Sequence, residues 1–136
     1  MTSKAVAPLS LITALLACTL TSAAYAGSTN VRMYKLNNKE QKIRIILRKA
    51  EQPGCHNMPL RGKQVAQFAQ KGFAWCNVYS ERNCAEESIV PALWTGKRYR
   101  KIEFDQTKPQ LKLFPGSDWQ LPTEDKRILS WYCEAR

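Results

Sequence analysis

Cysteines are the residues in this sequence whose number most clearly indicates their chemistry. The sequence holds five, and Cys55, Cys76, Cys84 and Cys133 lie beyond the first 26 residues. An even set of cysteines in a small exported domain is typical of disulfides, and four cysteines allow three pairings. Each disulfide stabilises such a domain by about 2–4 kcal/mol. We therefore expect two disulfides, and the number of cysteines alone leaves their pairing open.

Basic and aromatic residues interleave in the segment WTGKRYRK, residues 94–101. Proteins bind polyanions and nucleic acids with this combination, although an ordinary solvated strand face has the same composition. Beyond residue 26 the chain has 20 basic and 11 acidic residues, because Lys4 is the one charge before it, and 20 − 11 gives +9. That charge either favours an acidic partner or serves solubility alone. We expect a binding surface at Trp94, Lys97, Arg98, Tyr99, Arg100 and Lys101, extended by Lys42, Arg44 and Arg48 if both segments share a sheet.

Catalytic patterns are missing from the sequence. The single histidine, His56, lies in a turn-like segment beside Cys55, so we interpret it as a solvent-facing residue and expect no metal and no cofactor. Glu86 and Glu87 are adjacent, and on a strand adjacent side chains point to opposite faces. We expect a binding protein rather than an enzyme; a small secreted nuclease using His56 with a glutamate and an arginine is the enzymatic alternative.

The N-terminal residues predict export. An apolar run follows Lys4, and Ala24-Tyr25-Ala26 precedes Gly27, the pattern of a cleaved signal peptide over 1–26. The run is too short and too rich in hydroxyl residues for a membrane span. A second route is open, because the residues up to Cys18 resemble a lipobox that would leave a lipid anchor at Cys18. We expect a secreted or periplasmic protein whose residues 27–136 form one domain.

Alternating apolar and polar residues predict an antiparallel β domain with at most one short helix. In QKIRIILR, Ile43, Ile45 and Leu47 should be buried and the basic residues exposed. Pro91 should place its strand at a sheet edge or force a bulge. We expect a turn over 50–57, a loop carrying Trp119 over 115–126, and either a short helix or the close of a first motif over 62–72. The predicted strands are 31–36, 41–48, 73–79, 87–94, 95–104, 110–114 and 127–133.

The stretch VYSERNCAEES resembles the folded hairpin of βγ-crystallin Greek-key domains. In that family the hairpin has an aromatic residue, a charged turn that contains asparagine, a second aromatic residue and a serine. In this chain the corresponding positions hold Tyr79, Glu81, Asn83, Cys84 and Ser88. Ala85-Glu86-Glu87 stand where that family has its glycine. The resemblance implies a small two-sheet antiparallel Greek-key sandwich with two degenerate repeats, in which RIILRKAEQPGCHN, residues 44–57, would be the counterpart of the central stretch.

The C-terminal segment extends the resemblance. An acidic pair, Glu124-Asp125, precedes a short strand, as in the crystallin repeat. Calcium-binding members carry a hydroxyl pair where this chain has Ile128 and Leu129, so we expect no calcium.

The resemblance also implies a disulfide pairing and a class of function. Neighbouring strands for Cys76 and Cys133 would favour that pair, which leaves Cys55 with Cys84. Relatives of the fold include secreted protease inhibitors, so we expect an inhibitor- or immunity-type protein that binds an acidic protein or an anionic envelope polymer. Nucleic acid is possible but not favoured. The alternative is a secreted cationic antimicrobial or toxin.

Overall fold

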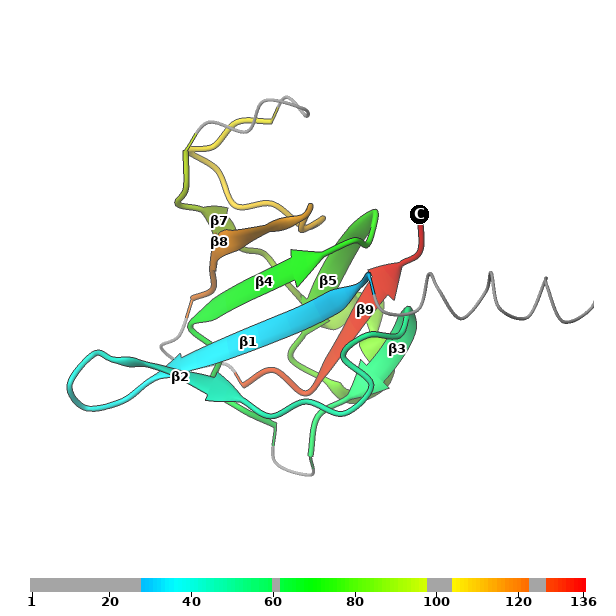
Figure 1. Cartoon of the computed structure of the whole chain (residues 1–136), viewed down its shortest axis with the longest axis horizontal. Coiled ribbons are helices and arrows are strands. Elements are labelled where there is room, and N and C mark those ends of the chain that lie inside the picture. The colour runs from blue at the N-terminus through cyan, green and yellow to red at the C-terminus, as the bar shows by residue number, and fades with distance from the viewer. Residues whose placement is uncertain (1–27, 60–61, 98–103, 123–126) are drawn as a thin grey trace, which may run out of the picture.

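Two antiparallel β-sheets make up the domain. The computed structural model describes residues 28–59, 62–97, 104–122 and 127–136 (Figure 1), so the expected signal segment 1–26 lies outside the described residues. A five-stranded sheet has the order β2-β1-β4-β8-β7 and a four-stranded sheet the order β3-β9-β5-β6. The expected small two-sheet β fold is therefore confirmed. The strands are β1 (Asn30–Leu36), β2 (Lys42–Ile45), β3 (Gly54–Asn57), β4 (Gln67–Lys71), β5 (Trp75–Tyr79), β6 (Ile89–Val90), β7 (Leu93–Trp94), β8 (Gly116–Gln120) and β9 (Ser130–Glu134).

The two halves of the chain exchange one strand each. β1, β2 and β4 pair in the five-stranded sheet, while β3 crosses to the other sheet and pairs with β9. In the same way β5, β6 and β9 form most of the four-stranded sheet, while β8 crosses back and pairs with β4. By strand order the β5–β6 hairpin corresponds to the β1–β2 hairpin. The expected equivalence of residues 44–57 with the central stretch is therefore wrong, because Cys55 lies on a crossing strand.

Large side chains from both sheets fill the space between them. Phe68 on β4 stands beside Met33 on β1 and Trp119 on β8, and all three are fully buried. From the other sheet Trp131 and Val78 are opposite each other on β9 and β5 and are buried too. Burying side chains of this size supplies most of the free energy that opposes chain entropy in a small domain.

Three predicted strands are confirmed, at 31–36, 73–79 and 127–133, as β1, β5 and β9, although β5 begins two residues later and β9 three residues later than predicted. The predicted strand 41–48 is shorter, because β2 ends at Ile45 and Lys49 adopts a left-handed φ of 60°. Within it Ile45 is buried, but Ile43 is 40 % exposed, contrary to expectation. The reason is geometric: Ile43 pairs with the exposed Lys35 near the end of the hairpin, where the sheet extends past the core.

In three other segments the structure differs from the prediction, and in a fourth it settles a prediction that had been left open. The supposed loop at 115–126 contains β8, the supposed turn at 50–57 contains β3, and the undecided segment 62–72 contains β4. The predicted strand 110–114 forms only isolated bridges, Gln110 to Ala92 and Leu113 to Cys76. β3 and β8 have little intrinsic strand preference, and their pairing with neighbouring strands decides their conformation.

Pro91 lies where the chain passes from one sheet to the other. β6 immediately before it is an edge strand of the four-stranded sheet, and β7 just after it is an edge strand of the five-stranded sheet. The predicted single strand 87–94 is therefore wrong in extent, because it consists of two short strands in different sheets on either side of Pro91. The expected edge position is confirmed, since proline cannot donate a ladder hydrogen bond.

Both disulfides join the pairs that the resemblance favoured. Cys76 and Cys133 face each other across β5 and β9, with Cα atoms 4.1 Å apart and both side chains fully buried. Cys55 on β3 joins Cys84 in the 3-10 helix η1 (Arg82–Cys84), with Cα atoms 6.1 Å apart. Disulfides form and persist in oxidising compartments, which agrees with an extracellular or periplasmic location.

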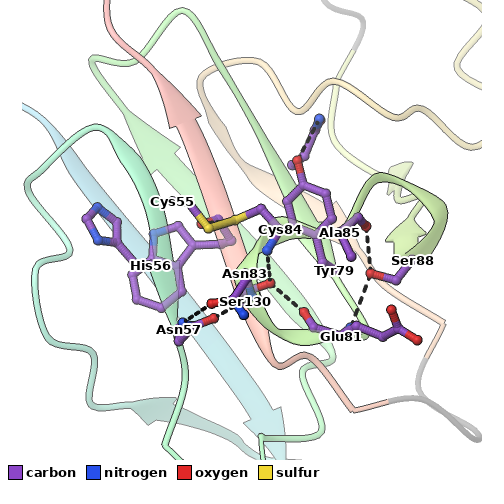
Figure 2. Close-up of a disulfide and its surroundings, with 12 residues drawn as sticks. Cys55, His56, Asn57, Tyr79, Glu81, Asn83, Cys84, Ala85, Ser88 and Ser130 are labelled. Atoms are coloured by element: carbon purple, nitrogen blue, oxygen red, sulfur yellow. Dashed lines mark hydrogen bonds between the residues drawn. A yellow bond between two sulfur atoms is a disulfide. The ribbon is translucent and has the colours of Figure 1, made fainter.

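The turn between β5 and β6 is closed by two serines (Figure 2). The Ser88 hydroxyl accepts the backbone N–H of Glu81 at 3.2 Å and donates to the carbonyl of Ala85 at 2.8 Å. The Ser130 hydroxyl accepts the backbone N–H of Cys84 at 3.0 Å and donates to the carbonyl of Glu81 at 2.5 Å. The polar backbone of the turn is thus satisfied by side chains from β9 and from the 3-10 helix η2 (Glu86–Ser88).

This turn reaches left-handed backbone conformations without glycine. Asn83 has φ of 61° and Cys84 has φ of 52°. Asn83 is held by Asn57, whose side-chain oxygen accepts the Asn83 backbone N–H at 2.7 Å. Asparagine tolerates this region well, and the disulfide and the Ser130 contact hold Cys84 in a conformation that non-glycine residues rarely adopt.

Replacing Ser130 by alanine should destabilise the domain by about 1–3 kcal/mol, because the turn would lose both hydrogen bonds to this buried hydroxyl. Ser117→Ala, at an exposed position on β8, is the matched control and should change stability by less than about 0.5 kcal/mol. The urea midpoints of the two variants give the comparison. Equal midpoints would show that the Ser130 hydroxyl does not stabilise the turn.

Candidate functional site

The β1–β2 hairpin extends from the sandwich on the side away from the four-stranded sheet (Figure 1). Its turn is held by Asn37, whose side-chain oxygen accepts the backbone N–H groups of Lys39 and Gln41, both at 2.9 Å. The Asn37 backbone N–H donates to the Gln41 carbonyl at 3.0 Å, and Glu40 takes a left-handed φ of 58°. The hairpin end is therefore ordered by its own hydrogen bonds rather than by the core.

Positive charge is concentrated on this hairpin and the residues that follow it. Residues 32–49 contain seven basic residues and one acidic residue, Glu40, which gives 7 − 1 = +6 of the +9 beyond residue 26. Such a concentration produces a local positive potential that attracts and orients anionic partners. The basic residues are Arg32, Lys35, Lys39, Lys42, Arg44, Arg48 and Lys49.

Apolar side chains are exposed at the same place. Ile46 is 91 % exposed, Leu36 50 % and Ile43 40 %, and the fourth large exposed hydrophobic residue among those described is Leu111. Scattered single hydrophobic residues on a surface need no explanation, whereas these three are grouped within the hairpin and the residue that follows it. Sequence reasoning missed this group, although the uninterrupted run Ile45-Ile46-Leu47 departs from alternation and could have signalled it.

The strand register sorts these side chains between the two faces of the hairpin. Tyr34 is opposite Arg44, and Leu36 is opposite Lys42, on the face turned away from the core. Lys35 is opposite Ile43 on the other face, beyond the last buried pair. We use the name hairpin surface for the exposed residues on both faces of the hairpin, Lys35, Leu36, Lys42, Ile43, Arg44 and Ile46. The expected exposure of Lys42, Arg44 and Arg48 is confirmed.

A hollow of about 450 Å³ continues the hairpin surface toward the residues after the 60–61 segment. Lys63, one of its lining residues, is fixed by two hydrogen bonds, from the Lys63 N–H to the Ile128 carbonyl at 3.0 Å and from the Ile128 N–H to the Lys63 carbonyl at 2.8 Å. Among its described lining residues are three cations and no acidic residue, so the positive potential extends into it. It is lined by Lys35, Leu36, Gly62, Lys63, Gln64, Ala66 and Arg127.

The second basic segment is only partly described. Arg98, Tyr99, Arg100 and Lys101 lie outside the described residues, whereas Lys97 is exposed and Trp94 is half-buried. The Trp94 ring packs edge-on against Trp119 at a centroid distance of 5.1 Å, and its indole N–H donates to the Lys97 carbonyl at 2.7 Å. Gly116 lies against the same ring, so much of the Trp94 surface is used in packing within the domain.

The two basic segments belong to the same sheet, as the expected patch requires, but they are not neighbours in it. β2 and β7 belong to the same sheet, but they are its opposite edges, with β1, β4 and β8 between them. At about 4.8 Å between neighbouring strands, β2 and β7 are roughly 19 Å apart. Lys42 and Arg44 therefore form a surface separate from Trp94.

The remaining groups of chemical interest have local partners. The His56 Nε2 lies 2.9 Å from the Gln52 carbonyl and 3.1 Å from the Pro53 carbonyl, so it donates to the backbone, and the ring packs against Trp131. His56 is on β3 and half-buried rather than in a solvent-facing turn. Within the described ranges, no three His, Cys, Asp or Glu side chains are grouped so as to hold a metal ion.

One carboxyl group and one phenol group in the described part of the chain have a shifted pKa. The hydroxyl and the backbone N–H of Thr107 donate to Asp105 and lower the pKa of its carboxyl. A hydrogen bond to Glu134 raises the pKa of the Tyr132 phenol. Each shift comes from a residue two positions away and reflects local structure away from the hairpin surface.

Comparison with protein-family models, curated proteins and solved structures found no match to this chain. In the described part of the chain, no helix has the length and apolarity needed to cross a membrane. Function is therefore inferred from the surface of the molecule itself.

Proposed function

We propose that this chain is an exported cationic binding module that neutralises or holds an acidic partner protein through its hairpin surface, as inhibitor- and immunity-type proteins do. The observation that carries this proposal is the coincidence of a +6 segment with three exposed apolar side chains within the hairpin and the residue that follows it. The two disulfides support export to an oxidising compartment.

A protein partner would use both the charged and the apolar residues of the hairpin surface, whereas a polymer would use mainly the charged ones. Charge alone would serve an anionic envelope polymer or a nucleic acid, because their affinity for a protein comes largely from the phosphates or other anions. Protein interfaces combine an apolar centre with a polar and charged rim. Leu36 and Ile46 would supply the apolar centre, and Lys42 and Arg44 the charged rim, because Leu36, Lys42 and Arg44 lie on the same face of the hairpin. An acidic protein surface would use both.

A relationship to βγ-crystallin-like domains is part of the proposal. The folded β5–β6 turn closed by Ser88, and the exchange of β3 and β8 between the two sheets, support it. A tight scaffold of this kind would present the β1–β2 hairpin at one end with little loss of conformational entropy on binding.

A secreted antimicrobial or toxin is the second candidate. The same exposed isoleucine beside lysine and arginine side chains would suit an anionic lipid surface. Dye release from vesicles rich in anionic lipid, at protein concentrations where the acidic partner is already saturated, would favour this candidate over the first.

Reversing the charges of Lys42 and Arg44 to glutamate should weaken binding to the acidic partner by about 30- to 100-fold at low salt. Each exposed ion pair is worth about 0–1 kcal/mol, and reversal adds repulsion to the lost attraction. The salt dependence of the affinity should flatten as well. Affinity is measured by titration against the protein captured from the native envelope fraction.

The matched control reverses Lys108 and Arg136, which changes the net charge by the same amount at positions outside β1 and β2. This control should weaken binding by less than about threefold, through the long-range field alone. If the Lys42 and Arg44 variant binds as tightly as wild type at low salt, the hairpin is a solvated face and the proposed function is wrong.

A further inference from the structure

β2 is an open sheet edge. It pairs with β1 on one side, and no strand in the described ranges pairs with its other side. An edge strand presents a row of backbone N–H and C=O groups that can pair with another chain. The hairpin surface therefore offers backbone hydrogen bonds as well as side chains.

The register identifies which backbone groups face that open edge. In an antiparallel pair, residues that exchange hydrogen bonds alternate with residues that do not. The Asn37 N–H donates to the Gln41 carbonyl, and stepping by two along this register makes Lys35–Ile43 and Met33–Ile45 the hydrogen-bonded pairs. Lys42 and Arg44 consequently direct their backbone N–H and C=O groups away from β1, toward the open edge.

The side chains of β2 define what would fit beside it. Lys42 and Arg44 lie on one face, and the partly exposed Ile43 lies on the other. An added strand places its side chains directly beside these, so acidic residues on one face and apolar residues on the other would be complementary. We propose that an extended acidic segment of the partner adds to β2 as a further strand of the five-stranded sheet. This inference rests on the proposed function and specifies its binding mode.

A second copy of the chain is a poorer occupant of the same edge. Two β2 strands side by side would bring Lys42 and Arg44 of one copy against those of the other, and like charges directly opposite each other are destabilising. The basic side chains thus disfavour self-pairing while they favour an acidic strand, which makes the edge selective.

Two synthetic peptides test the charge and the periodicity together. One alternates glutamate with valine, and the control has the same residues with all glutamates in one block. Alternation places glutamates beside Lys42 and Arg44 and valines beside Ile43, so the alternating peptide should bind at least about tenfold more tightly. It should also slow hydrogen exchange at the Lys42 and Arg44 amides. Equal affinities, or no binding of either peptide at low salt, would overturn the proposal.

Proline substitution tests the backbone hydrogen bonds separately from charge. Arg44→Pro and Arg44→Gln both remove one positive charge, but only proline removes the N–H that faces the open edge, and an edge strand accepts proline at such a position. Arg44→Pro should bind the alternating peptide at least about tenfold more weakly than Arg44→Gln. Lys42→Pro with Lys42→Gln provides the same comparison if Arg44→Pro unfolds.

The outcomes separate this binding mode from the proposed function. If the Lys42 and Arg44 charge reversal weakens binding to the acidic partner while the proline and glutamine variants bind equally, strand addition is wrong and the proposed function stands. If the charge reversal has no effect, the proposed function fails first. Slower exchange at the Ile43 amide without change at Lys42 and Arg44 would also contradict pairing at this edge.

Discussion

Replacing Cys76 and Cys133 together by alanine is expected to lower the free energy of unfolding by about 4 kcal/mol. The two residues are 57 apart in the sequence, and the loop-closure entropy of a cross-link of that length is of this size. The bond also lies in the middle of the four-stranded sheet, between β5 and β9, with both sulfur atoms inside the core. A small domain has about 5–15 kcal/mol in total, so this variant should lose a large share of its stability.

Urea unfolding under non-reducing conditions measures this loss, and the Cys55→Ala, Cys84→Ala variant is the matched control. Its loop is 29 residues, and the loop-length term differs between the two disulfides by only about 0.6 kcal/mol. A larger difference would come from packing, because Cys55 is exposed whereas Cys76 and Cys133 are buried. We expect the Cys76 and Cys133 variant to be the less stable; the opposite order would show that the turn at Cys84 matters more to the fold than the core.

Replacing Trp119 by alanine should cost about 3–5 kcal/mol. The side chain is fully buried, its indole N–H donates to the Phe114 carbonyl at 2.8 Å, and its ring packs on Phe104 at a centroid distance of 5.8 Å. Alanine would leave a large cavity between the sheets and remove the donor for that carbonyl. Thermal and urea unfolding of the variant measure the loss.

Trp94→Ala is the companion variant, because this ring contacts Trp119 from the edge strand β7 and is only half-buried. It should destabilise the domain less than Trp119→Ala does. Affinity for the acidic partner, measured beside stability, separates packing from binding: a loss of affinity in a fully folded Trp94 variant would return Trp94 to the binding surface. Equal destabilisation by the two substitutions would contradict the assignment of Trp119 as the central packing residue.

Periodicity in the sequence was sufficient to predict the strands whose two faces differ. β1, β5 and β9 carry alternating or continuous apolar residues that need burial, and the four cysteines beyond residue 26 correctly indicated two disulfides. The pairing followed from the strand layout that the resemblance implies, in which the strands of Cys76 and Cys133 are neighbours, and it agrees with the structure.

Only pairing with strands distant in the sequence determines that β3 and β8 are strands. Gly54–Asn57 and Gly116–Gln120 have few residues that favour strands, and each becomes a strand because it crosses to the sheet of the other half of the chain. No local pattern encodes such a crossing, since the hydrogen-bonding partners lie tens of residues away in the sequence.

Part of the hairpin surface could likewise be predicted from the sequence, and part of it depends on the tertiary structure. Its charge is a property of composition, and the exposure of Lys42, Arg44 and Arg48 was predicted from alternation. The exposure of Ile43 was not, because a residue with an inward orientation is buried only where another layer lies over it, and the β1–β2 hairpin extends beyond that layer. That β2 is an edge, and lies at the opposite side of the sheet from Trp94, follows from strand order. Strand order is set by long-range packing, which a single sequence does not display.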